Sequence, residues 1–167
     1  MEAVITVVGI GPGSRDYIIP AAEKAIEAAT ILIGSKRALT EFASERQCQR
    51  VVDKDIEGVL DFIAAADEQE KVVVMVSGDP GFYSLLAAIK ERFDSKAIKV
   101  IPGISSVQAA FARIGEIWQN AEFISLHGRT ADERRLRYEP GRVLGILTDG
   151  KYCPQAIAEC LLKYSWP

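Results

Sequence analysis

The segment KVVVMVS at residues 71–77 constrains the fold of this chain more than any other. Its central residues are all apolar, and the run is too short for a helix of ordinary length. A strand that is apolar at every position must be covered on both faces, which is typical of parallel sheets with helices on each side. The segment therefore predicts an α/β protein.

Similar short runs rich in valine and isoleucine recur along the chain, and helical patterns separate them. In the first such helix, for example, Ala22, Ala25, Ile26 and Ala29 share one face. Strands are predicted at residues 3–9, 30–34, 50–53, 71–77 and 98–103, with helices between them. This alternation of strand and helix predicts a mostly parallel sheet.

The segment GEIWQN at residues 115–120 interrupts this alternation, and we place a domain boundary there. An N-terminal α/β domain at residues 1–116 and a C-terminal α/β domain at residues 121–167 are predicted. The second domain offers strands in 121–129 and 142–149 and a helix near its end. Because so few strands remain for it, this second domain is expected to be incomplete.

The composition argues against several classes of protein. Of the 167 residues, 49% are hydrophobic and 26% charged, as in ordinary folded domains. A net charge of −3 argues against a nucleic-acid partner bound through a basic face. No apolar run reaches the length of about 18 residues that a membrane span needs, so no membrane partner is expected. The cysteines form no CxxC pair and His127 is the only histidine, so we expect no metal site and a reducing, cytoplasmic location.

A glycine-rich turn, GIGPG at residues 9–13, follows the first predicted strand. It resembles a dinucleotide-binding loop but departs from that pattern in three ways. Ser14 stands where a third glycine is needed, Pro12 lacks a backbone N–H, and no acidic residue ends the strand at 30–34. Dinucleotide binding is therefore not expected. Taken alone, the motif is better explained as a tight strand-to-helix turn than as a binding loop.

Two further turns follow other predicted strands: SGDPG at residues 77–81 and PGISS at residues 102–106. Taken alone, Asp79 could be a turn-forming or helix-capping residue. In a parallel sheet, however, the three turns would gather at the carboxyl edge, where open α/β proteins bind ligands. Their combination favours a binding site.

These three turns, together with VIPGISSVQAAFARIG, ISLHGR and LTDGK, resemble the tetrapyrrole (corrin/porphyrin) methylase family, in particular the branch that methylates carbon 5 of the corrin ring. The resemblance extends over nearly the whole chain. It implies two α/β domains with a ligand cleft between them, S-adenosylmethionine as methyl donor, and a (cobalt-)precorrin substrate in cobalamin biosynthesis. It also implies a homodimer and, as functional partner, a separate decarboxylating methylase that acts on carbon 15.

The same resemblance implies which residues hold the donor. The second and third turns would contact its methionine part, the first turn would line the cleft, and a strand end in the second domain would meet its adenine. The donor-binding residues expected on this basis are Ile10, Gly78, Asp79, Gly81, Phe82, Ser105, Ser106, Leu147 and Thr148. Glycine at positions 78 and 81 would let a ligand approach the backbone closely.

The substrate carries several carboxylates, so its site requires cations. Arg129 is the first candidate because a guanidinium matches a carboxylate in shape, and Arg15 follows the first turn. Gly11 and Pro12 are expected to contact the substrate as well. If a ring proton is lost, His127 could be the base, although a structural hydrogen-bonding role fits it equally well. His127 and Arg129 are thus the candidate catalytic pair.

Two other interpretations stay open at this stage. A protein of the same fold could methylate another substrate, such as a different ring position, an rRNA ribose or a modified histidine, although the acidic composition counts against RNA. A non-catalytic ligand-binding module is the alternative from another functional class.

Overall fold

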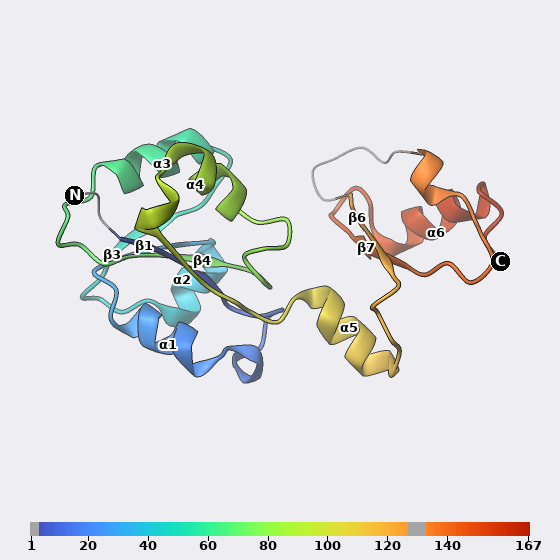
Figure 1. The fold of residues 1–167 in the computed structure, drawn as a ribbon, viewed down its shortest axis with the longest axis horizontal. Helices are drawn as coiled ribbons and strands as arrows, with labels where there is room; N and C mark the ends of the chain where they lie inside the picture. The colour runs from blue at the N-terminus through green and yellow to red at the C-terminus, as the bar shows by residue number, and fades with distance from the viewer. Residues whose placement is uncertain (1–3, 127–132) are drawn as a thin grey trace. The chain divides into compact units, whose positions relative to one another are not determined.

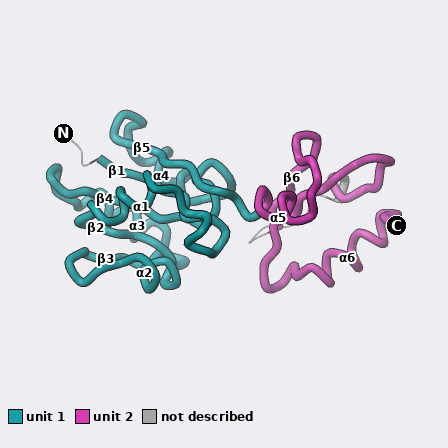
Figure 2. Tube along the Cα trace, turned by 90° about the horizontal axis from the view of Figure 1, so that it is seen from below, with its two compact units in different colours: residues 1–106 teal, residues 107–167 magenta. Residues whose placement is uncertain are grey.

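The computed structural model describes residues 4–126 and 133–167. Contacts divide the chain into two compact units, unit 1 at residues 1–106 and unit 2 at residues 107–167 (Figure 2). The division falls at the start of helix α5 (Ser106–Ile114), ahead of the segment 115–120 where the sequence analysis places a boundary.

Unit 1 contains a five-stranded sheet in which all paired strands run parallel. The strands are β1 (Ile5–Gly9), β2 (Ile31–Gly34), β3 (Cys48–Val51), β4 (Val72–Val76) and β5 (Ile98–Ile101), in the spatial order β3-β2-β4-β1-β5. Strand β4 is buried at all five positions, as its apolar sequence predicts. The α/β class and the parallel sheet expected from the sequence are confirmed.

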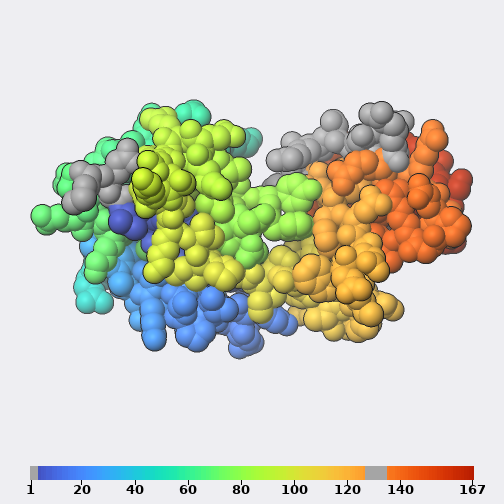
Figure 3. Space-filling model, viewed as in Figure 1, coloured from blue at the N-terminus to red at the C-terminus, as the bar shows by residue number. Residues whose placement is uncertain are grey.

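Helices cover both faces of this sheet (Figure 1). Helices α1 (Pro20–Glu27) and α2 (Lys36–Phe42) lie on one face, and α3 (Ile56–Ala64) and α4 (Leu86–Arg92) on the other. Alternate residues of β4 serve the two layers: Val74 packs with α3 and α4, and Val73 with α1 and α2. In the space-filling view the α1 segment (blue) and the α4 segment (yellow-green) lie on opposite sides of unit 1 (Figure 3). Two short 3-10 helices, Arg15–Tyr17 and Ser95–Ala97, complete the unit.

Strand β3 begins at Cys48, two residues before the predicted start at residue 50. It is an edge strand whose side chains are mostly exposed, so no apolar run marks its position. Its start is fixed instead by Gln47, which is buried and donates through Nε2 to the carbonyl oxygens of Ile26 and Ala29.

Unit 2 contains α5, the parallel strands β6 (Glu122–Ser125) and β7 (Leu144–Leu147), a 3-10 helix at Glu133–Leu136, and α6 (Pro154–Leu162). A small core includes Ile124 and Ile157. Arg142 donates two hydrogen bonds, of 2.9 and 2.8 Å, to the carboxylate of Glu122. These bonds hold the pKa of Glu122 below its ordinary value of 4.5. Over the described parts of both units, no helix has the length and apolar character to cross a membrane.

The carboxyl ends of β1, β4 and β5 meet through glycines in unit 1. A Cβ atom at Gly9 would lie 2.5 Å from the carbonyl oxygen of Gly78 and 2.7 Å from the backbone nitrogen of Gly103. A Cβ at Gly103 would overlap the same carbonyl oxygen. Because backbone atoms cannot rotate away as a side chain can, the three segments can pack this closely only with glycine at Gly9 and Gly103.

We predict that Gly103→Ala destabilises the protein by about 3 kcal/mol or more, because an overpacked site bounded by backbone has no side chain that can yield. The free energy of unfolding in urea measures this loss. Gly150→Ala is the matched control, since a Cβ there meets nothing within 4 Å. Equal stability of the two variants would show that the three segments are not packed as described.

Candidate functional site

The first and second turns are joined by backbone hydrogen bonds. The N–H of Gly78 donates to the carbonyl oxygen of Gly11 over 2.9 Å, and the N–H of Ile10 donates to the carbonyl oxygen of Val76 over 3.0 Å. Gly11 and Gly78 have φ angles of 75° and 72°, values that glycine adopts without steric cost. The two turns therefore leave the sheet side by side.

Asp79 joins the second turn to the third. Its Oδ1 accepts from the N–H of Gly81 at 2.8 Å, within its own turn, and its Oδ2 accepts from the N–H of Gly103 at 3.0 Å. A carboxylate has about four acceptor positions, and these bonds occupy two. Because Asp79 is only partly buried, its free acceptor positions could bind an ammonium group of a ligand.

The structure brings together the predicted donor-binding residues of unit 1. A Cβ at Gly78 would lie 3.4 Å from the Cα of Ser105, so the second and third turns are in contact. Gly81 is exposed and Ser105 is buried. The side chain of Ile10 packs in the core of unit 1 and is 4% exposed, which leaves only its backbone for a ligand.

Arg15 already has partners within unit 1. It donates to the carbonyl oxygen of Glu41 at 2.6 Å, lies 3.7 Å from the Glu41 carboxylate, and stacks over the ring of Phe42. Arg37, which the sequence analysis does not select, lies at the first turn instead. One of its terminal nitrogens would be 3.0 Å from a Cβ placed on Gly13. No sequence pattern distinguishes Arg37 from other exposed arginines.

Tyr83 is a second residue that the sequence analysis misses. It follows the second turn, and its φ of 51° lies in the left-handed region. Such a conformation costs a residue other than glycine roughly 1–2 kcal/mol. The local sequence Phe82-Tyr83-Ser84 contains no glycine or asparagine that would predict it.

The predicted residues outside unit 1 belong to unit 2 or fall outside the described residues. Leu147 and Thr148 are in unit 2, at the carboxyl end of β7. His127 and Arg129 lie outside the described residues. Their assigned roles stay predictions, as does the contact of Pro12 and of Ser106 with a ligand. Among the residues that the structure describes, no group of three or more His, Cys, Asp or Glu side chains is placed to hold a metal ion.

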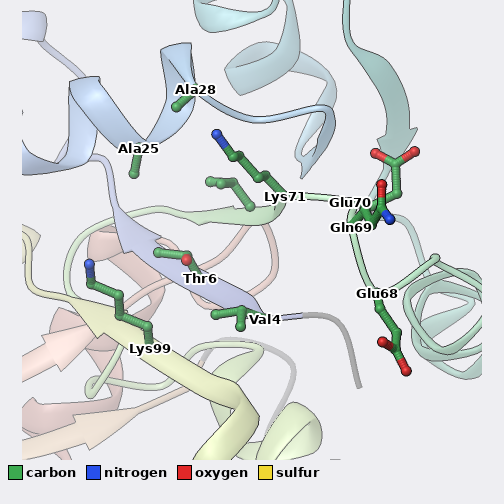
Figure 4. Close-up of a pocket in the computed structure, with 10 residues that line it drawn as sticks. Val4, Thr6, Ala25, Ala28, Glu68, Gln69, Glu70, Lys71 and Lys99 are labelled. Carbon is green, nitrogen blue, oxygen red and sulfur yellow. The ribbon is translucent and has the colours of Figure 1, made fainter. Parts of the chain in front are cut away.

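A hollow of about 390 Å³ lies at the opposite edge of the sheet, where the strands begin (Figure 4). It is lined by Thr6 of β1, Lys99 of β5 and the small residues Ala25 and Ala28 at α1. This hollow is separate from the three turns, because it involves the amino ends of strands whose carboxyl ends carry the turns.

Comparison with known proteins decides the family. The sequence model of the tetrapyrrole (corrin/porphyrin) methylases matches residues 4–166. The chain belongs to this family. It is 35% identical over 159 residues to the cobalt-precorrin-7 C(5)-methyltransferase of Salmonella typhimurium. This alignment covers 95% of the present chain and 78% of the Salmonella protein.

Two solved structures extend the comparison. The crystal structure of the methyltransferase CobJ superposes on this chain with a TM-score of 0.78 and 25% sequence identity. The superposition covers 99% of this chain and 78% of the CobJ chain. The structure of the precorrin-6Y methylase (cbiE) from Archaeoglobus fulgidus superposes on this chain with a TM-score of 0.70 and 27% sequence identity. That superposition covers 89% of this chain and 75% of the Archaeoglobus chain. The family expected from the three turns is thus confirmed, and with it a methyltransferase activity.

We predict that Asp79→Ala lowers the free energy of unfolding as well as weakening any ligand that the turn binds. The part-buried bond to Gly103 is charge-assisted, and its loss should cost about 1.5–3 kcal/mol. Urea unfolding measures the effect. Asp94→Ala is a suitable control, because Asp94 also accepts a backbone N–H within a turn, that of Lys96, but joins no second loop. A loss no larger than that of the control would mean that Asp79 does not join the turns.

Proposed function

We propose that this protein is an S-adenosylmethionine-dependent methyltransferase that acts on ring carbon 5 of a (cobalt-)precorrin in cobalamin biosynthesis. The observation that carries the proposal is the 35% identity, over 95% of the chain, to a protein named for that reaction. A methylase for another ring position is the alternative within the family.

The chemistry of the donor suits the joined turns of unit 1. S-adenosylmethionine carries an ammonium, a carboxylate and a sulfonium but no phosphate, so neither a phosphate cradle nor Mg²⁺ is needed. The free acceptor positions of Asp79 suit its cationic groups, and the exposed Gly81 would let a ligand reach the backbone. Leu147 and Thr148 complete the proposed donor-binding set.

Methyl transfer is a displacement at carbon. The C–S bond of the sulfonium breaks as the ring carbon forms a new C–C bond, and S-adenosylhomocysteine leaves as a neutral thioether. The electron-rich ring carbon needs no covalent help from the protein. Positioning the two reactants and excluding water should therefore supply most of the acceleration. Where a ring proton must be lost, His127 is the proposed base.

The carboxylates of the substrate require cationic side chains that are not already engaged within the protein. Arg129 is the first proposed carboxylate partner. Arg37 joins it because its guanidinium lies against Gly13 of the first turn. Arg15 is a weaker proposal than the sequence suggests, because binding a substrate carboxylate would compete with its contacts to Glu41.

We predict saturable binding of S-adenosylhomocysteine, measured by titration calorimetry, and no binding of NAD. Incubation with a precorrin acceptor and methyl-labelled S-adenosylmethionine should then place one labelled methyl group on carbon 5, as located by NMR. Label at another ring carbon would retain the family and reject the assigned position. An absence of any binding of S-adenosylhomocysteine would reject the proposed donor.

We predict that Arg129→Ala raises the KM for the precorrin while leaving the affinity for S-adenosylhomocysteine unchanged. The loss should be about 2–5 kcal/mol if the pair with the substrate carboxylate is buried and smaller if it is exposed to solvent. Arg129→Lys should recover only part of this, because an ammonium cannot make the two-pronged contact. A fall in donor affinity at constant KM would place Arg129 on the donor side or in the scaffold.

A further inference from the structure

The hollow at the amino edge of the sheet is formed by the register of the strands. Val73, Thr6 and Lys99 are register partners on β4, β1 and β5, so their side chains lie in one row on the same face of the sheet. Val4 and Lys71 lie two residues earlier along the chain than members of this row, so they project from the same face. These five neighbouring side chains all border the hollow.

Helix α1 leaves this part of the sheet open. It packs over Val73, which is buried, but Ala25 and Ala28, its two residues at the hollow, carry only a methyl group each. Beside the helix, Thr6 is therefore only partly buried, and Lys99 is exposed. The resulting volume of about 390 Å³ lies within the range of small-molecule sites in proteins. The hollow is thus large enough for a small organic molecule.

Three polar groups of the hollow have no partner within residues 4–126 and 133–167. The ammonium groups of Lys71 and Lys99 and the hydroxyl of Thr6 take part in no hydrogen bond or ion pair there. Figure 4 shows the Thr6 side chain between the two lysines. It also shows both ammonium groups on one side of the hollow and the carboxylates of Glu68 and Glu70 on the other. The acidic residues of the rim therefore do not pair with these two ammonium groups.

The lining of the hollow fits an anion that also has an apolar part. Two ammonium groups and one hydroxyl can donate to the oxygens of a single phosphate, sulfonate or carboxylate group. The valines of the row and the alanines of α1 form an apolar wall next to these donors. An aromatic or aliphatic body would remove that wall from water, which a purely hydrophilic anion would not do.

We propose that this hollow is a binding site for a small organic anion. Lys71, Lys99 and Thr6 hold its charged group, and its apolar body lies against Val73 and the small residues of α1. The site is separate from the three turns, because it borders the opposite ends of the strands that carry them. Its occupation therefore does not depend on the proposed methyl transfer and does not compete with the methyl donor.

The first measurement titrates the whole chain with 1-naphthyl phosphate, followed by calorimetry. This probe joins a compact apolar ring system to one anionic group. We expect saturable binding, with the same affinity in the presence of saturating S-adenosylhomocysteine. 1-Naphthol, which keeps the rings but lacks the charge, should bind about tenfold more weakly. An absence of saturable binding would overturn the proposal, as would competition with S-adenosylhomocysteine, which would place the probe at the three turns.

A pair of double variants tests the cationic groups. Lys71→Gln/Lys99→Gln should lower the affinity for 1-naphthyl phosphate about tenfold, because two exposed charge pairs are lost. Lys90→Gln/Lys163→Gln removes the same charge from exposed positions that do not border the hollow, in α4 and after α6. This control should change the affinity by less than about twofold. Equal losses in the two double variants would show a general charge effect and overturn the proposal.

A second pair of variants tests the shape of the hollow without changing any charge. Ala28→Leu narrows the hollow at an exposed position, so the chain should fold normally while its affinity for the probe falls at least about fivefold. Ala21→Leu is the matched control, since Ala21 is also exposed on α1 but does not border the hollow. Thermal unfolding checks that both variants fold. Unchanged affinity in Ala28→Leu would place the probe on the outer surface and overturn the proposal.

Discussion

The backbone contact among Gly9, Gly78 and Gly103 is the constraint on which the rest of unit 1 depends. The carbonyl oxygen of Gly78 occupies the space where side chains on the other two residues would have to lie. Since β1 lies between β4 and β5 in the sheet, this contact sets how closely the carboxyl ends of these three neighbouring strands converge. The turns that follow can touch one another only because the strand ends do.

The single carboxylate of Asp79 has two structural roles. As a turn residue it binds the N–H of Gly81, and as a cross-link it binds the N–H of Gly103. The sequence offers turn formation and ligand binding as alternatives for Asp79, but the geometry makes them compatible. Two backbone donors hold the carboxylate in place, and its free acceptor positions are thereby preorganised for a ligand. A stability effect on substitution would therefore not argue against a binding role.

The sequence predicts most of this fold because the strands are short apolar runs and the helices have apolar stripes. Strand β3 is the exception, since an exposed edge strand has no such run and its start depends on the side chain of Gln47. The three turns are also predictable, because glycine and proline mark them. Individual side chains are not. The engagement of Arg15 by Glu41 and the left-handed backbone of Tyr83 arise from contacts between distant segments or from hydrogen bonding around the turn, which residue type alone does not reveal.

The glycine spacing of the first turn has a physical explanation that needs no nucleotide. Gly9 admits the backbone of the second and third turns, whereas Gly11, with a positive φ, leaves room for Tyr17, whose Cβ would lie 2.9 Å from an added side chain. Gly13, with a φ of 134°, leaves room for Arg37. Each glycine thus accommodates a neighbouring part of the same unit rather than a phosphate. Pro12 is tolerated for the same reason, because a turn that cradles no phosphate does not need that N–H as a donor. A loop can therefore resemble the dinucleotide pattern through packing requirements alone, and its departures from that pattern are consistent with a donor that carries no phosphate.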